Sequence, residues 1–118
     1  MTIISEETSF LTFINVFTVS PDNQQRLIDL LTQATDLSVC HAKGFVSAAL
    51  HRSLDGTKVT MYAQWQSMEA YQAMRGDPIA MPYLTKALAI ATFEPGAYTV
   101  ARTFPPPSHK SVTRCVGG

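Results

Sequence analysis

The dipeptide Asp55-Gly56 lies between two strand-like segments, and it limits the possible fold of this chain more than any other feature. Asp-Gly favours a two-residue hairpin turn, because both central positions of such a turn need a positive φ. Phe45 to Ser53 and Lys58 to Trp65 are then antiparallel neighbours. The predicted cross-strand pairs are Arg52 with Val59, Leu50 with Met61, Ala48 with Ala63 and Val46 with Trp65. One face of the hairpin is thus nearly all apolar and is expected to pack in a core.

A strand and a long helix precede this hairpin. Residues 10–19 are rich in β-branched and aromatic types, and Ser20 then offers a helix N-cap with Pro21 at the first helical position. Apolar residues at helical spacing extend that helix to about Cys40, and Gly44 stops it. Alternation places on one face of the strand Leu11, Phe13, Asn15, Phe17 and Val19.

Further helical segments and a last strand follow the hairpin. Ser67 caps one helix, and Asp77-Pro78 begins a second. Ala97 to Phe104 is predicted to be a strand, after which three prolines end regular structure. The residues expected to face inward from the second helix are Met81, Leu84, Ala87, Leu88 and Ala91.

This order of elements predicts an α+β fold of the ferredoxin-like split βαβ type, an antiparallel sheet with helices on one face. We expect an N-terminal extension over residues 1–9, one domain over 10–104 and a proline-rich flexible tail over 105–118. The plan leaves the other sheet face bare unless two copies pair. With 46% hydrophobic and only 15% charged residues, the composition also favours a covered surface, so a homodimer is expected.

Charge and targeting signals exclude several partners. Nine basic residues balance nine acidic ones, so the chain has no field that would attract nucleic acid or an anionic membrane. Residues 1–9 contain Glu6 and Glu7 rather than a signal peptide, and no apolar run has membrane length. We therefore expect a cytoplasmic protein with two free thiols, Cys40 and Cys115.

Conventional catalytic motifs are missing from the sequence. His41, His51 and His109 are scattered and do not combine with Cys, Asp or Glu in a metal-ligand spacing. The chain also has no glycine-rich phosphate loop and no nucleophile elbow. The sequence therefore predicts no metal site, no phosphate cradle and no activated serine.

Three residues stand out as candidates for chemistry. Asn15 lies in an apolar row, and a buried amide without partners costs on the order of 1–3 kcal/mol, so it must bond either to backbone or to a ligand. Trp65 ends the third strand and Tyr71 lies about one turn into the next helix, so both side chains are able to face one cavity, or else simply to pack. The candidate substrate contacts around the same volume are Met61, Met74, Met81 and Leu84, with core filling as the alternative.

Several stretches resemble the antibiotic biosynthesis monooxygenase family, and the likeness spans nearly all of residues 10–104. They are Gly44-Phe45-Val46-Ser47-Ala48, Asp55-Gly56-Thr57, Tyr62-Ala63-Gln64-Trp65-Gln66-Ser67 and Glu69-Ala70-Tyr71. The resemblance implies a dimeric α+β barrel that oxidises phenolic tricyclic substrates with O2 and uses neither metal nor flavin. Trp65 N–H and Tyr71 O–H match family positions that would stabilise the substrate anion.

The sequence also departs from that pattern. A family asparagine four residues before the tryptophan is Met61 here, and an arginine on the later helix aligns near Thr85. In the haem-degrading branch a first-strand asparagine matches Asn15, but the haem-ligating histidine falls near Leu84.

Three hypotheses follow for the function. The first is a cofactor-independent monooxygenase acting on a small phenolic or quinol-like aromatic, with Trp65, Tyr71 and Asn15 as catalytic residues. The second is a dimeric small-molecule binding or stress-associated protein of the same fold without catalysis. The third is an isomerase or decarboxylase, which would need a general base near the pocket.

Overall fold

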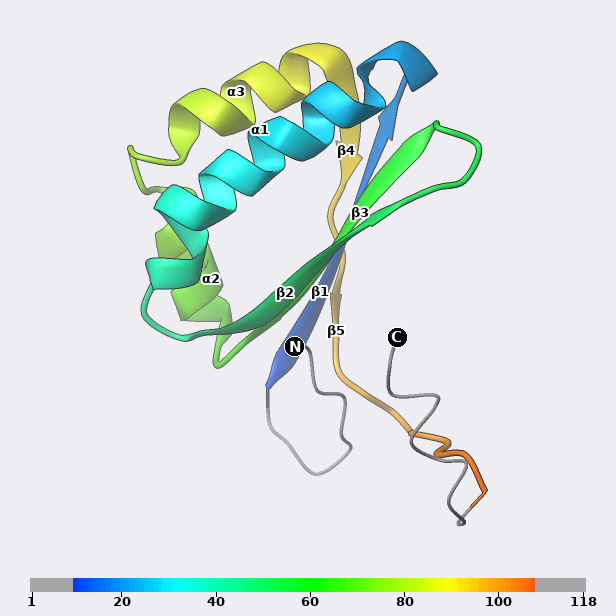
Figure 1. The fold of residues 1–118 in the computed structure, drawn as a ribbon. Coiled ribbons are helices and arrows are strands. Elements are labelled where there is room, and N and C mark those ends of the chain that lie inside the picture. The colour runs from blue at the N-terminus through cyan, green and yellow to red at the C-terminus, as the bar shows by residue number, and fades with distance from the viewer. Residues whose placement is uncertain (1–9, 108–118) are drawn as a thin grey trace.

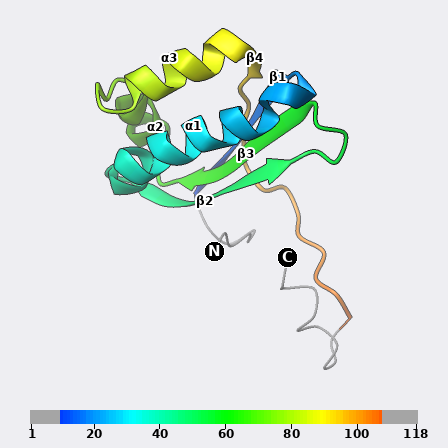
Figure 2. The ribbon, with the colours of Figure 1, turned by 45° about the horizontal axis from the view of Figure 1, so that its top comes forward.

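The computed structural model describes residues 10–107, and within them a single antiparallel sheet is covered on one face by three α-helices (Figures 1 and 2). The strand order is β2-β3-β1-β4, with the short β5 also paired to β1. The strands are β1 Leu11–Val19, β2 Phe45–Arg52, β3 Lys58–Trp65, β4 Ala91–Glu94 and β5 Ala97–Tyr98. The helices are α1 Gln24–Leu37, α2 Met68–Arg75 and α3 Met81–Ile90, with 3-10 turns at Pro21–Asn23 and Val39–His41. The predicted ferredoxin-like α+β fold is confirmed.

The central strand β1 alternates as its sequence predicts. Phe13, Asn15, Phe17 and Val19 are buried on the face that carries the helices. Asn15 is thus a single amide within an apolar row, and its 8% exposure leaves it almost fully withdrawn from water. This placement makes the partners of Asn15 a central question for the site.

The hairpin keeps its predicted register but not its predicted turn. Asp55 has a negative φ and only Gly56, at φ +82°, is left-handed, so the prediction of a two-residue turn is wrong. Ser53 and Lys58 are joined by a backbone hydrogen bond of 3.0 Å, and residues 54–57 form the loop. One residue is added on each side, so the pairs from Arg52–Val59 to Ala48–Ala63 remain as predicted.

The loop is closed around the carboxylate of Asp55. One of its oxygens accepts hydrogen bonds from the Thr57 backbone N–H at 3.0 Å, the Thr57 hydroxyl at 2.7 Å and the Ser53 hydroxyl at 2.8 Å. The backbone and side chain of Thr57, followed by Ser53, lower the pKa of Asp55 to about 2, because these donors favour the ionised form.

A β-bulge changes the far end of the hairpin. Trp65 pairs with Phe45 rather than with the predicted Val46, because Val46 is an extra residue between Phe45 and Ser47. The bulge lies directly after Gly44, whose φ of +87° and closeness to Ala70 leave no room for a side chain. A Cβ at Gly44 would lie 2.5 Å from the Ala70 Cβ, so β2 and α2 meet tightly here.

The helix predicted to extend from Pro21 to Cys40 is shorter and divided. A 3-10 turn precedes α1, the Ser20 side chain makes no capping bond, and α1 ends at Leu37. Ser38 stops the helix, and its hydroxyl donates instead to the carboxylate of Asp77. This hydrogen bond, with the Ile79 N–H next, lowers the pKa of Asp77 and ties the end of α1 to the segment after α2.

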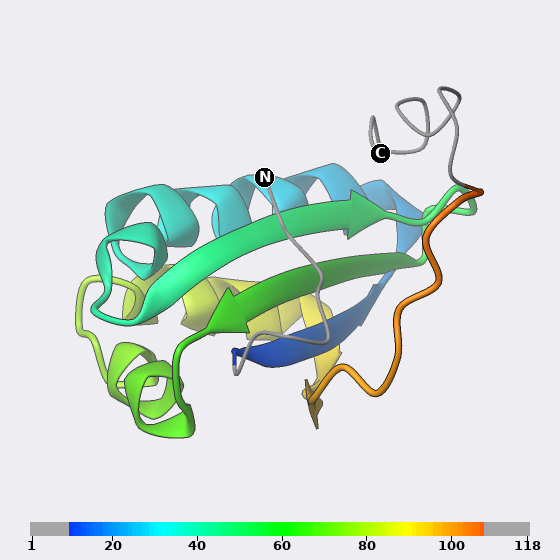
Figure 3. The ribbon, with the colours of Figure 1, turned by 90° about the horizontal axis from the view of Figure 1, so that it is seen from below.

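The end of the domain differs most from the sequence prediction. The last strand is not Ala97 to Phe104: β4 begins at Ala91, directly after α3, and β5 covers only Ala97–Tyr98. Residues 99–107 have no regular structure and run away from the sheet, whose helix-free face is seen in Figure 3. The expectations for residues 1–9, His109 and Cys115 lie outside the described residues.

The core is divided into two apolar clusters along β1. One cluster gathers Phe17 with Leu27, Leu31, Val59 and Ala87 beneath α1 and α3. The other gathers Phe13 with Val39, Ala63, Trp65 and Tyr71 near α2. Asn15 stands on β1 between the phenylalanines of the two clusters, and this gap is where the main pocket opens.

Candidate active site

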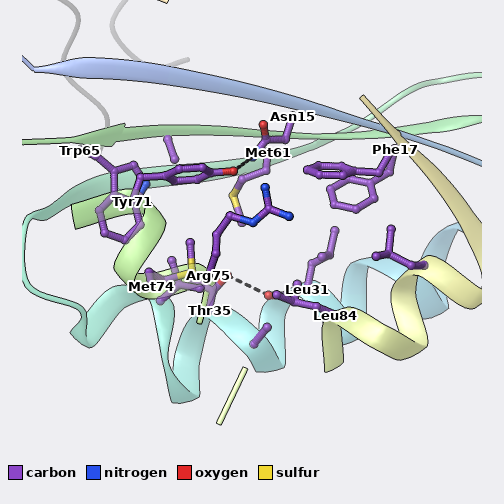
Figure 4. Close-up of a pocket in the computed structure, with 15 residues that line it drawn as sticks. Asn15, Phe17, Leu31, Thr35, Met61, Trp65, Tyr71, Met74, Arg75 and Leu84 are labelled. Carbon is purple, nitrogen blue, oxygen red and sulfur yellow. Dashed lines mark hydrogen bonds between the residues drawn. The ribbon is translucent and has the colours of Figure 1, made fainter. Parts of the chain in front are cut away.

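A pocket between the sheet and the helices brings together most of the residues singled out in the sequence (Figure 4). The space inside it is about 740 Å³ when the open solvent at its mouth is included. Six of the seven predicted site residues line it, namely Asn15, Met61, Trp65, Tyr71, Met74 and Leu84. The walls are otherwise mainly aliphatic and aromatic.

Met81 is the predicted residue that the structure places elsewhere. It is 47% exposed and is absent from the pocket lining. The buried stripe of this region runs through Ala80 and Ala87, both fully buried and seven residues apart, so Met81 is rotated by about 100° away from it. Leu84 and Leu88 both line the pocket, although Leu88 is 52% exposed.

The amide of Asn15 is oriented by the protein itself. Its Oδ1 accepts a hydrogen bond of 3.4 Å from the backbone N–H of Gly96, a group that acts only as a donor. The Nδ2 group must then face the other way, and it donates to the Tyr71 hydroxyl at 3.4 Å. The sequence left open whether the amide bonds to the protein or to a ligand. In the structure both of its polar atoms bond to the protein.

The Tyr71 hydroxyl is left with a free proton by this arrangement. Because its oxygen accepts from Asn15, its own O–H remains available to donate into the pocket. The ring is held in place by stacking on Phe13, with ring centroids 3.9 Å apart and planes inclined by 14°. Tyr71 is therefore a fixed donor at the wall of an apolar cavity.

Trp65 stands beside this tyrosine. Its ring meets Tyr71 edge to face at 5.9 Å and Phe45 at 5.4 Å, and the residue is only 1% exposed. Within residues 10–107 its indole N–H makes no hydrogen bond. A second neutral donor thus accompanies Tyr71 in the same wall.

Sequence reasoning missed Arg75, which also lines the pocket. It follows Tyr71 by four residues on α2, and side chains at this spacing share one helix face. That spacing is the signal that would have found it. Thr85, where the family arginine aligns, is exposed and is not among the lining residues, so in this chain the guanidinium group of the pocket comes from α2.

The chemistry open to this pocket follows from its polar groups. Among the described residues that line it there is no carboxylate and no imidazole, so these residues offer no conventional general base. Among the described residues, no three His, Cys, Asp or Glu side chains gather as a metal site, and no helix has the length and hydrophobicity to span a bilayer. Two neutral donors in apolar surroundings are suited to bind an aromatic ring and to stabilise negative charge on its oxygen, and the cation adds a site for an anionic group.

Fold and pocket together define a ferredoxin-like α+β protein with an apolar cavity for a small molecule. The sequence pattern of the family described as antibiotic biosynthesis monooxygenase matches residues 10–80. The chain is also 38% identical over 104 residues to the tetracenomycin-F1 monooxygenase of Streptomyces glaucescens, covering 88% of this chain and 93% of that protein. The chain belongs to the antibiotic biosynthesis monooxygenase family.

Solved structures of similar proteins agree with this assignment. SnoaB, a cofactor-independent oxygenase from Streptomyces nogalater, matches with a TM-score of 0.67 and 25% identity, over 84% of this chain and 100% of its own. The monooxygenase from the gene ActVA-Orf6 of Streptomyces coelicolor, in complex with nanaomycin D, matches with a TM-score of 0.68 and 27% identity, over 82% of this chain and 91% of its own. These similarities support a monooxygenase in general.

Proposed function

We propose that this protein is a cofactor-independent monooxygenase that oxidises a phenolic or quinol-like aromatic with O2. The observation that carries the proposal is the Gly96–Asn15–Tyr71 hydrogen-bond chain, which leaves the Tyr71 O–H free beside Trp65 in an apolar pocket. The relatives named as monooxygenases and as a cofactor-independent oxygenase support the same reaction class.

The reaction balances without an added reductant. A substrate such as an anthrone ionises to an enolate, passes one electron to O2, and the two radicals combine to a carbon-bound peroxide. Loss of water then leaves a carbonyl group, so the ring CH2 supplies four electrons, one oxygen atom enters the product and the other leaves as water. The protein contributes a water-poor cavity and two donors that stabilise the enolate.

The described residues of the pocket lining include no general base, and this favours a second candidate, a binding protein of the same fold without catalysis. Under the first proposal the substrate must be acidic enough to ionise with the help of the two donors alone. Under the second proposal the aromatic molecule binds and does not react. Both candidates therefore predict binding, and only the first predicts turnover.

Oxygen uptake by purified, metal-stripped protein with anthrones and naphthols separates them. We expect protein-dependent uptake that falls on the order of a hundredfold in both Trp65→Phe and Tyr71→Phe, since each loses one donor to the anion. Tyr98→Phe is the matched control, because Tyr98 is exposed and lies outside the pocket lining. Ligand binding without any uptake would leave the binding protein as the function.

We also propose that two copies pair through the helix-free face of the sheet (Figure 3). The half-buried Ala49 and Tyr62 face each other across β2 and β3 there, and no helix of the described chain covers them. Light scattering should give a dimer mass for the wild type and a monomer for Ala49→Glu, with Gln33→Glu on exposed α1 as the control. A wild-type monomer would contradict this pairing.

A further inference from the structure

Arg75 lines the pocket and lies against two aromatic rings. It comes from the last turn of α2 and reaches toward the level of Asn15 between the aromatic rings of the pocket (Figure 4). Its guanidinium carbon lies 5.9 Å from the centroid of the Tyr71 ring and 5.8 Å from that of Phe93. Contacts of this kind hold the planar cation against the ring faces.

This cation has no anionic partner in the described part of the chain. Among residues 10–107, Arg75 makes the two ring contacts and no hydrogen bond or ion pair. The residues of the 10–107 range that line the pocket include no other charged side chain. Its five N–H donors are therefore available to whatever occupies the pocket.

We propose that the pocket selects aromatic molecules that carry a carboxylate on the ring system, and that Arg75 binds this carboxylate. That the ligand is aromatic rests on the proposed function. The inference adds a second contact, between Arg75 and a negative charge on the ligand. A planar guanidinium matches the two oxygens of a carboxylate in a bidentate pair, which favours this anion over a neutral carbonyl.

The exposure of Arg75 also distinguishes it from the two neutral donors. Tyr71 and Trp65 are buried, whereas Arg75 lines the same cavity and is exposed. A hydroxyl group on the ligand would meet the neutral donors inside, and the carboxylate would stay at the guanidinium, where water still solvates it. Arg75 is then a specificity residue for binding and not the group that stabilises the reacting oxygen.

Calorimetric titration without oxygen tests this with two matched probes, 6-hydroxy-2-naphthoate and its methyl ester. They share the ring and the hydroxyl and differ in charge. We expect the carboxylate to bind the wild type about tenfold more tightly than the ester, and Arg75→Gln to abolish this preference with little change in ester affinity. Arg75→Lys should keep part of the preference, because lysine retains the positive charge but cannot form the bidentate pair of hydrogen bonds.

Arg26→Gln is the matched control, because Arg26 is exposed on α1 and is not part of the pocket lining. The preference should also weaken with added salt in the wild type and not in Arg75→Gln. Equal affinities for acid and ester in the wild type, or a preference that survives in Arg75→Gln, would overturn the inference. Oxygen uptake is not part of this readout, so failure of the proposed oxygenase activity is recognised separately.

Discussion

The side-chain amide of Asn15 donates a hydrogen bond of 3.4 Å to the hydroxyl of Tyr71, a residue 56 positions later in the chain. The direction of this bond is set by Gly96, whose backbone N–H occupies the amide oxygen. Strand β1, helix α2 and the short link between β4 and β5 thus combine to present one O–H group to the pocket. The first two predictions concern this unit.

Asn15→Asp should reverse the direction of the hydrogen bond between residue 15 and the Tyr71 hydroxyl without changing the shape of the side chain. The new carboxylate still accepts from Gly96, but it also accepts the Tyr71 proton, which is then lost to the ligand. We expect oxygen uptake to fall about tenfold or more with the fold retained, as followed by an oxygen electrode and circular dichroism. Asn23→Asp, outside the pocket lining, should behave as wild type; equal activity in both variants would show that the Tyr71 proton is not needed.

Substitutions of Tyr71 should separate its hydroxyl from its ring. Tyr71→Phe keeps the stack on Phe13 and should lower the free energy of unfolding by about 1 kcal/mol, since it loses one hydrogen bond. Tyr71→Ala empties a buried site and should cost about 3–5 kcal/mol. Urea denaturation measures both values. Similar losses in the two variants would mean that the hydroxyl, and not the ring, dominates stability.

Gly44→Ala should destabilise the protein by roughly 2 kcal/mol or more, because the residue has a φ of +87° and a new Cβ would meet the Ala70 Cβ at 2.5 Å. Gly76→Ala is the control, since its φ is negative and its nearest neighbour would lie at 3.7 Å. We expect the control to change stability by less than about 0.5 kcal/mol in chemical denaturation. A neutral Gly44→Ala would contradict the tight contact between β2 and α2.

Asp55 should make the free energy of unfolding depend on pH. Its pKa is lowered to about 2 by the Thr57 and Ser53 donors, so the folded state binds a proton less readily than the unfolded chain does. The stability from this group is present above its ordinary pKa near 3.8 and is lost as pH falls toward 2. Urea titrations from pH 5 to 2 should show a shallower loss for Asp55→Asn. Thr57→Val should give an intermediate slope; an unchanged slope in Asp55→Asn would contradict this account.

The sequence was sufficient for the parts of the fold where one local rule acts alone. Alternation placed Asn15 and its apolar neighbours correctly on β1, and the hairpin register held because it depends on which face is buried. The turn itself was wrong, since Asp55 is held at negative φ by its own side-chain hydrogen bonds. Asp-Gly suits more than one kind of hairpin loop.

Other features depend on contacts that no local pattern carries. The last strand was placed too late because Ala97 to Phe104 has strand-like residues, whereas pairing with β1 begins at Ala91. Met81 was expected in the pocket, yet the stripe of α3 is set by its packing through Ala80 and Ala87. Arg75 was overlooked because a long cation at a helix end is usually solvated, although its spacing of four residues from Tyr71 indicated a shared helix face.

The position of the pocket between the two apolar clusters gives an occupant a mechanical role. Phe17 and Leu31 from one cluster and Ala63 and Trp65 from the other line the same cavity, so the pocket lies where the two clusters adjoin. A flat ring bound in this pocket would contact residues of both clusters at once. A bound ligand would then stabilise the packing of the two clusters together, and the protein should unfold at a higher temperature when the ligand is present.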